Sequence, residues 1–179
     1  MSICYHVLKN KTYKDFIETT SIIPRLSKVK DNDFCYVEPK LLLKSHIYDK
    51  ITILGNIRVL IFEQKAFINK GNIHVDLTKD KLPHHPVLNI VLEGQGGMRW
   101  YTPTNPGILK FTHNSWYRAW HNNYGQQLDE WNTGKVAIVR TDIPHLAFNE
   151  ENSTRLVASI RWDKSYTFTD TIKFFEDNF

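Results

Sequence analysis

The pattern that most constrains the fold is a succession of short apolar runs between residues 55 and 168. The runs are rich in Val, Ile, Phe, Tyr and Trp, and they are separated by Gly, Pro, Asn and Asp, which is typical of an all-β sandwich or barrel. Eight runs are recognisable: IRVLIFEQ, NIHVDL, VLNIVLEG, GMRWYTP, ILKFTHNSWY, KVAIVRT, PHLAFN and TRLVASIRW. Eight strands suit two facing sheets that enclose a cavity. The predicted fold class is therefore an all-β core of the double-stranded β-helix type (jelly roll, or cupin-like), with a few flanking helices.

Two short helices are expected in the N-terminal segment, residues 1–54. Apolar residues at helical spacing follow Thr12, a candidate N-cap, and predict a helix over residues 11–20. A second helix is expected to begin at Pro39, because proline is favoured in the first helical turn. This segment is predicted to be a helical or irregular support for the core.

The C-terminal segment 169–179, TDTIKFFEDNF, predicts a closing helix. Thr169 or Asp170 is the expected cap, and Ile172 and Phe175 form a packing stripe. A chain of 179 residues suits one domain. The core, residues 55–168, and its two flanking segments are therefore predicted to form one unit.

Composition predicts a soluble, cytoplasmic protein. No stretch approaches the roughly 18 consecutive apolar residues of a membrane span, and the first residues lack the apolar core of a signal peptide. Cys4 and Cys35 lie far apart and are expected to be reduced thiols. The first 70 residues hold 12 Lys and Arg against 7 Asp and Glu. These charges alternate with apolar residues as on a solvated face, so nucleic-acid binding is not favoured, and an acidic partner stays open.

The triplet His74-Val75-Asp76 is the first element of a candidate metal site. In an extended strand, side chains two residues apart project to the same face, so His74 and Asp76 are aimed at one point. Two histidines and one carboxylate on one face of an octahedron suit iron(II) that activates oxygen. The pattern therefore requires a second histidine from elsewhere in the chain.

His145 is the predicted third ligand, because it follows a turn-like lead into a short strand and a reversal comes after it. A hairpin centred near Glu151 would place residue 145 opposite about residue 157, with Arg155 on the same face, one pleat away. The planar guanidinium can bind a carboxylate through two hydrogen bonds, and its burial needs an anionic partner. The alternative is a surface ion pair of Arg155 with Glu150 or Glu151.

In this order, the triplet at His74 and Asp76, the distal His145 in DIPHLAFN and the arginine in TRLVASIRW resemble the Fe(II)/2-oxoglutarate-dependent oxygenase superfamily. Within it, the chain is similar to the aspartyl/asparaginyl β-hydroxylase-like branch and to the small phage or bacterial hydroxylases. The resemblance covers about residues 55–162 and includes the stretch LNIVLEGQG.

The resemblance implies Fe(II) bound by His74, Asp76 and His145, and 2-oxoglutarate that chelates the metal and pairs its distal carboxylate with Arg155. It also implies O2 as the oxidant and the release of succinate and CO2. Animal members of the β-hydroxylase branch lack the carboxylate ligand, and related halogenases replace it with a small residue, so Asp76 favours hydroxylation. The implied substrate is an amino acid, either free or as a side chain in a peptide or protein, and the oligomeric state stays open.

Two other polar residues are candidates for ligand contacts. Asn89 is expected either to hydrogen-bond the co-substrate or to be a satisfied core amide. Arg161 shares its strand parity with Arg155 but lies about 20 Å further along at ~3.3 Å per residue, so it is expected not to reach the same ligand. Arg161 stays available for substrate.

Two rival functions fit parts of the pattern. A cupin-type metalloprotein or isomerase would share the stretches LNIVLEGQG and IPHLAFN, although cupins usually place several histidines and a glutamate in the first metal motif. A non-catalytic jelly-roll module that binds peptide or sugar would bind neither iron nor 2-oxoglutarate tightly. Fold alone does not separate these functions.

Several other residues have plainer interpretations. His84 and His85 precede Pro86 and are expected to form a polar turn. The polar stretch HNNYGQQLDEW is a candidate lid or substrate-facing loop. The aromatic residues near it are more typical of sheet packing; they are Trp116, Tyr117, Trp120 and Trp131.

Overall fold

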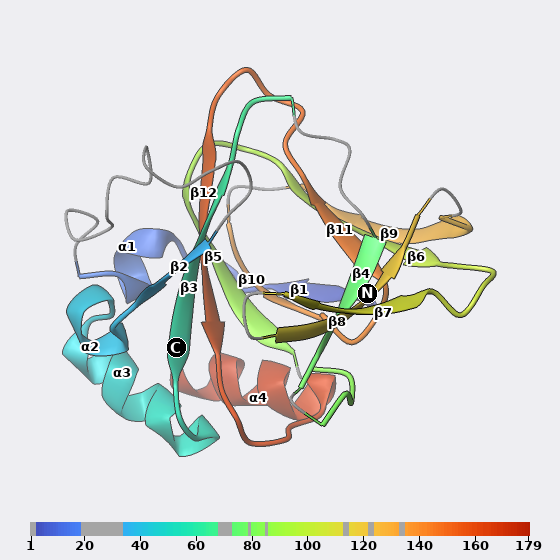
Figure 1. The fold of residues 1–179 in the computed structure, drawn as a ribbon. Helices are drawn as coiled ribbons and strands as arrows, with labels where there is room; N and C mark the ends of the chain where they lie inside the picture. Colours follow the sequence, from blue (N-terminus) through green and yellow to red (C-terminus); the bar gives the residue numbers. More distant parts are fainter. Residues whose placement is uncertain are drawn as a thin grey trace.

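The computed structural model describes residues 3–18, 34–67, 73–78, 80–84, 86–112, 115–121, 124–132 and 135–179. Over these residues the chain forms two antiparallel six-stranded sheets with a few helices beside them (Figure 1). The prediction of a mostly β chain built from two facing sheets is confirmed. Cys4 is buried and Cys35 is half-buried, and neither forms a disulfide among the described residues. Among the described residues, no helix combines the length and the apolar character needed to cross a bilayer.

The first sheet has the strand order β1-β10-β5-β12-β3-β2. In that order its strands are Tyr5–Val7, Val136–Val139, Val87–Glu93, Arg155–Arg161, Arg58–Gln64 and Phe34–Val37. Both edge strands, β1 and β2, come from the N-terminal segment 1–54. The helices predicted in this segment are present, but the prediction of a helical or irregular support did not include these two strands, which complete the sheet at both ends.

The second sheet has the strand order β7-β8-β4-β11-β6-β9. In that order its strands are Ile108–Thr112, Ser115–Trp120, Ile73–Leu77, His145–Phe148, Gly97–Thr102 and Gln126–Trp131. The run ILKFTHNSWY forms two strands instead of one. The stretch HNNYGQQLDEW contributes β9 instead of a lid, and the ion pair of Glu130 with Arg99 on β6, at 2.8 Å, compensates its polar sequence.

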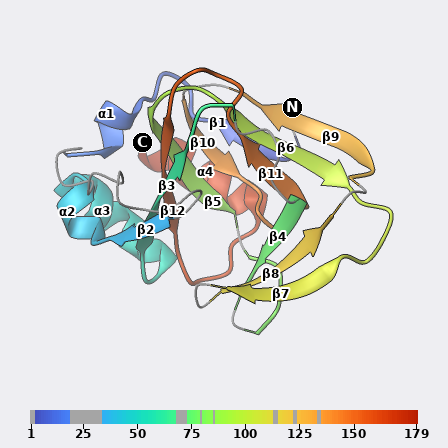
Figure 2. The ribbon, with the colours of Figure 1, turned by 45° about the horizontal axis from the view of Figure 1, so that its top comes forward.

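The helices cover the outer face of the first sheet (Figure 2). They are α1 (Tyr13–Phe16), α2 (Pro39–Leu42), α3 (Ser45–Ile51), a 3-10 helix (Thr52–Leu54) and α4 (Phe168–Asn178). Alternate strand residues such as Ile61, Ile138 and Ile160 pack against them and against one another in a buried cluster. The helix at Thr12 is shorter than predicted, and residues 19–20 of the predicted span lie outside the described part of the chain.

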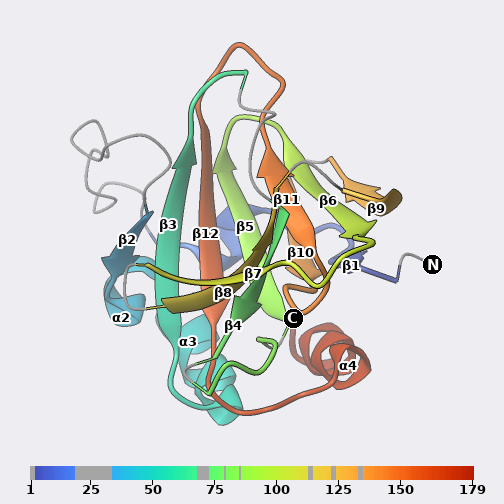
Figure 3. The same cartoon turned by 45° about the vertical axis from the view of Figure 1, so that its right-hand side comes forward.

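The remaining alternate residues of the first sheet face the second sheet. Val157 and Val91 join Met98 and Trp131 in a second buried cluster between the sheets. At this side Tyr5 of β1 stacks on Trp100 of β6, with ring centroids 5.7 Å apart. The sheets are therefore closed along β1 and β9. Figure 3 shows the other side, where β7 and β8 pass in front of β12 and β3.

The cap of α4 is Thr167, not Thr169 or Asp170 as predicted. The Thr167 hydroxyl accepts a hydrogen bond from the Asp170 backbone N–H at 3.1 Å. Replacing Thr167 with alanine is expected to lower the free energy of unfolding by about 1 kcal/mol, because this N–H loses its partner. Urea denaturation measures the change. Thr169→Ala is the matched control, and an equal loss there would contradict the assignment of the cap.

Candidate metal and anion site

The three predicted metal ligands lie together on the inner face of the second sheet. His74 and Asp76 are two residues apart on β4, and His145 on β11 pairs in register with His74. One ligand atom from each of the three side chains lies within 4.8 Å of the others. The Nε2 atom of His74 is 3.7 Å from Oδ1 of Asp76, and the two imidazole ring centroids are 4.5 Å apart. The structure therefore brings together two imidazoles and one carboxylate, as the alternation of the triplet predicts.

His145 is the most deeply placed of the three, with 3% of its surface exposed. Its Nδ1 lies 2.9 Å from the backbone oxygen of Ile143. With the proton assigned to Nδ1, that nitrogen donates to the carbonyl and Nε2 offers its lone pair. Burial, together with the neighbouring His74, lowers the pKa of His145 to about 4. The ring is therefore neutral at pH 7, which is the form that binds a metal.

Asp76 is held as a carboxylate by its surroundings. Burial by itself raises the pKa of this carboxyl, but the Arg161 guanidinium and, after it, the nearby histidines outweigh burial and hold the pKa well below its usual range. Nη2 of Arg161 lies 2.9 Å from Oδ2 of Asp76, while Oδ1 is turned toward His74. One carboxylate oxygen is thus engaged by the arginine, and the other is directed toward the imidazoles.

The strand pairing around His145 and Arg155 corrects one prediction. β11 pairs with β4 and β6, whereas β12 pairs with β3 and β5, so the predicted hairpin between the strands of His145 and Arg155 is wrong. The two strands lie in opposite sheets, and it is the far end of β12 that faces the metal ligands. Arg161, which was expected not to reach the ligand of Arg155 and to stay available for substrate, contacts Asp76 directly.

Arg155 lies at the other end of β12 and is buried, with 2% of its surface exposed. Its Nη1 donates a hydrogen bond to Oε1 of Gln64, and its guanidinium carbon lies 5.9 Å from the centre of the Trp131 ring. Burial lowers the pKa of Arg155 to about 10, so it stays protonated at pH 7. Its Nε and Nη2 are buried and have no hydrogen-bond partner among the described residues. Arg155 is therefore a buried cation whose described partner is a neutral amide.

The alternative of a surface ion pair for Arg155 is not what the structure shows. Glu150 pairs with Arg99 instead, at 2.9 Å. Asn149, at the start of the reversal, donates to the backbone oxygens of Gln64 and Ser153 and so ties the end of β3 to the loop before Arg155. This tie fixes the position of the arginine.

Asn89 lies on β5 between the two arginines. It pairs in register with Ser159, which is on the inner face of β12 between Arg155 and Arg161. Its Nδ2 lies 3.4 Å from Sδ of Met98, and its Oδ1 is buried and has no hydrogen-bond partner among the described residues. A satisfied core amide, one of the two predictions, does not describe this side chain. The inner face therefore carries a polar strip from Arg155 through Asn89 to Arg161.

Of the two histidines in the predicted polar turn, only His84 lies in the described part of the chain, and it supports the site through its backbone. The backbone N–H of His84 donates to the Asp76 carbonyl at 2.8 Å, and so supports the strand that carries the ligand. His85 lies outside the described residues. A cavity of about 380 Å³ lies near this turn, lined in part by His84, Arg140 and Phe168, and none of the three ligand residues lines it.

Two contacts at the site were not predicted from the sequence. The ring of Tyr117 on β8 meets His74 edge to face, with centroids 6.3 Å apart, and Tyr117 pairs in register with Asp76. It had been assigned only to sheet packing. The contact of Arg161 with Asp76 is the other, although the strand parity with Arg155 already put Arg161 on the same face.

The buried His145 makes the metal-free protein sensitive to acid. Its native pKa of about 4 lies below the ordinary value of 6.5, so the unfolded chain takes up a proton that the native chain excludes. The free energy of unfolding is expected to fall as the pH drops from 6.5 toward 4, by an amount on the order of 3 kcal/mol. Urea denaturation across this range, with His145→Gln for comparison, measures the effect. Equal slopes for both proteins would contradict it.

No protein-family model matches the chain, and no curated protein matches its sequence. What the protein does must therefore be argued from its own site.

Proposed function

We propose that this protein is an Fe(II)- and 2-oxoglutarate-dependent oxygenase that hydroxylates an amino-acid-type substrate, on a fold of the double-stranded β-helix type. One observation carries the proposal. A His74/Asp76/His145 cluster shares the space between the sheets with Arg155, a buried cation whose Nε and Nη2 have no hydrogen-bond partner among the described residues.

The donor set fits iron(II). Two imidazole nitrogens and one carboxylate oxygen leave the other coordination positions open, as oxygen-activating iron requires. When bound, the iron with its co-substrate supplies the oxidising chemistry, in which oxidative decarboxylation of 2-oxoglutarate gives succinate and CO2. The residues themselves supply the geometry. The Ile143 carbonyl sets the orientation of His145, and Arg161 holds one oxygen of Asp76.

The buried arginine fits the distal carboxylate of 2-oxoglutarate. A guanidinium removed from water is costly unless an anion pairs with it, and two of its nitrogens are available to bind a carboxylate. Asn89, whose Oδ1 is also unpartnered, lies between Arg155 and the end of β12 that meets the ligands. The polar strip therefore supports a ligand that extends from the metal toward Arg155, with its charged end there.

The direct test is an anaerobic titration with Fe(II) and 2-oxoglutarate, followed by the visible metal-to-ligand charge-transfer band. We expect the band to appear only when both are present, and to be absent when succinate replaces 2-oxoglutarate. Exposure to oxygen should then yield succinate. Tight iron binding without the band would favour a cupin-type metalloprotein, and binding of neither would favour a jelly-roll binding module.

A further inference from the structure

Among the described residues, no strand pairing joins the two sheets on the side away from β1 and β9. The contact of Arg161 with Asp76 joins β12 to β4, so β3 and β2 of the first sheet lie on the same side as β8 and β7 of the second (Figures 2 and 3). On this side, residues on the inner faces are exposed: Tyr36 is 58% exposed and Ile108 is 59% exposed. We call this side the open edge, defined by strands β2, β3, β7 and β8.

The metal site is reached from the open edge. The exposed fraction rises from 3% for His145 to 18% for the Asp76 side chain and 32% for the His74 side chain. His74 and Asp76 are on β4, next to β8, whereas His145 is on β11, one strand further from β8. A molecule that approaches the metal therefore passes between β2 and β3 on one side and β7 and β8 on the other.

The first sheet presents an aromatic wall at the open edge. Phe34 and Tyr36 are two residues apart on β2, and Phe34 pairs in register with Phe62 of β3. The Phe34 ring lies 5.5 Å from the Tyr36 ring, edge to face, and 5.6 Å from the Phe62 ring. Phe62 pairs in register with Val157, whose side chain belongs to the core between the sheets, so these rings are on the inner face. The outer face of the same strands carries Ile61, in the cluster with the helices.

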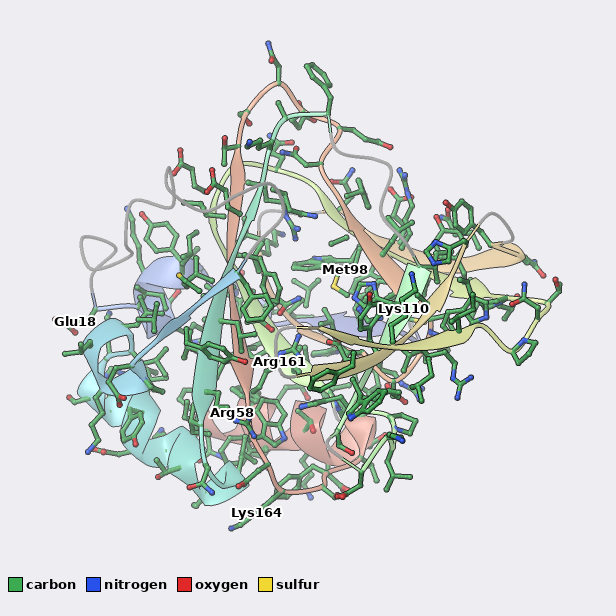
Figure 4. All side chains as sticks on the ribbon, viewed as in Figure 1. Glu18, Arg58, Met98, Lys110, Arg161 and Lys164 are labelled. Carbon is green, nitrogen blue, oxygen red and sulfur yellow. The ribbon has the colours of Figure 1, made fainter. Side chains whose placement is uncertain are left out.

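Cations flank this wall. Arg58 on β3 pairs in register with Arg161, so the two share the inner face, about 5 Å apart at ordinary strand spacing. On the second sheet, Lys110 of β7 pairs with Tyr117, which pairs with Asp76, so Lys110 lies two strands from the ligand, about 10 Å. Figure 4 shows Arg161 in the space between β12 and β4, where it contacts Asp76.

Among the described contacts, Arg161 pairs with the Asp76 carboxylate, whereas Lys110 and Arg58 form no ion pair with a carboxylate. Nζ of Lys110 lies 2.7 Å from Nε2 of His121, which is an imidazole nitrogen and not a carboxylate oxygen. Nε of Arg161 is buried and without a hydrogen-bond partner among the described residues. Asp163 accepts hydrogen bonds from Asn56 at 2.8 and 2.5 Å, and these bonds, with a smaller effect of the Arg58 charge, lower the pKa of Asp163.

The charges do not cancel even with the metal and co-substrate in place. Iron(II), the Asp76 carboxylate, dianionic 2-oxoglutarate and the guanidinium groups of Arg155 and Arg161 together leave one positive charge. Arg58 and Lys110 add two more at the open edge. Like charges on neighbouring strands repel, and an anion between them relieves the repulsion.

We propose that the open edge binds the substrate as a small organic anion, a carboxylate joined to an aromatic or bulky apolar group. The ring lies on Phe34, Tyr36 and Phe62, and the carboxylate lies between Arg58 and Lys110. This inference rests on the proposed function, because it assigns the substrate of the same metal. It narrows an amino-acid-type substrate to one whose amino group is acylated or absent, so that its net charge is negative.

Four compounds with one apolar body test the charge. N-acetyl-L-phenylalanine is an anion, L-phenylalanine is a zwitterion, L-phenylalanine amide is a cation and N-acetyl-L-phenylalanine amide is neutral. Each is titrated by anaerobic calorimetry into the Fe(II) and 2-oxoglutarate complex, and also into the protein alone. We expect the anion to bind at least about fivefold more tightly than the neutral amide, and the cation to bind most weakly. Equal affinities, or a preference for the cation, would overturn the proposal.

Variants test the residues. Lys110→Gln should weaken binding of the anion about fivefold and leave the neutral amide unaffected, and Lys110→Arg should restore it. Tyr36→Ala should weaken both compounds about tenfold. Lys173→Gln on α4 and Leu41→Ala on α2 are matched controls, because both residues are exposed and lie on helices outside the first sheet. If N-acetylglycine binds as tightly as N-acetyl-L-phenylalanine, the aromatic wall has no role.

The two proposals fail separately. The walls of the open edge belong to the chain, so the protein alone should show the same order of affinities, more weakly, even if the charge-transfer band never appears. Conversely, a normal band together with no preference among the four compounds would leave the oxygenase intact and exclude this substrate class.

Discussion

Replacing His145 with alanine is expected to lower the affinity for Fe(II) by more than about 100-fold and to abolish 2-oxoglutarate turnover. Loss of a partner that only orients a ligand commonly costs 10- to 100-fold in metal affinity, and loss of the ligand itself should cost more. His145 contributes its nitrogen from a site that is already desolvated and oriented by the Ile143 carbonyl. Equilibrium dialysis of the metal measures the loss, with the charge-transfer band as the second readout.

His46→Ala is the control for this experiment, because His46 is an exposed histidine on α3 and lies outside the site. It removes the same side chain without touching the cluster, so iron affinity should not change. A His145→Ala protein that is folded, as judged by near-UV circular dichroism, and that still binds iron as the parent does would refute the assignment of this ligand.

Replacing Arg155 with methionine is expected to have two effects of opposite sign. Binding of 2-oxoglutarate should weaken about 100-fold, because the carboxylate would then be buried without its cation. The metal-free, ligand-free protein should become more stable by about 1 to 3 kcal/mol, because buried N–H groups without partners are removed and an apolar side chain of similar length takes their place. Urea denaturation and titration of the charge-transfer band measure the two effects.

The opposite signs separate a binding role from a structural one. An arginine kept for stability would make Arg155→Met destabilising by several kcal/mol, and that result would remove the main support for the anion site. Arg118→Met on β8 is the comparison, because Arg118 pairs in register with Val75 and so lies on the outer face of the second sheet. It should leave 2-oxoglutarate binding unchanged.

The parts of the site that depend on local geometry were predictable from sequence. The two-residue period of a strand puts His74 and Asp76 on one face whatever the rest of the fold does. His145 was also predicted, because it is the histidine that begins a short apolar strand directly after a turn. The mostly β character was predictable from the spacing of the runs, because each run is short, apolar and bounded by turn residues, as a strand is.

The parts that depend on which strands pair were not predictable in the same way. The reversal after Asn149 suggested a hairpin, but β12 crosses to the other sheet, and this choice is set by burial against β3 and β5, far away in sequence. The predicted hairpin put the start of β12 beside His145. The contact between Arg161, at the other end of β12, and Asp76 was therefore not predicted. Polar β9 was missed because its charges are compensated by a partner 31 positions away, Arg99, and not by its own pattern.

The pairing of His145 with His74 has a mechanical consequence. It is the single register pair between β11 and β4, whereas the neighbouring ladders in the second sheet contain four or five. The sheet is thus two three-stranded halves joined by a narrow seam, with one metal ligand on one half and two on the other. An ion held by all three would act as a cross-link across that seam, so loading the metal and stiffening the sheet become the same event. The half that carries β7 and β8, and with it one wall of the open edge, would then be held more firmly in the metal-bound protein than in the metal-free one.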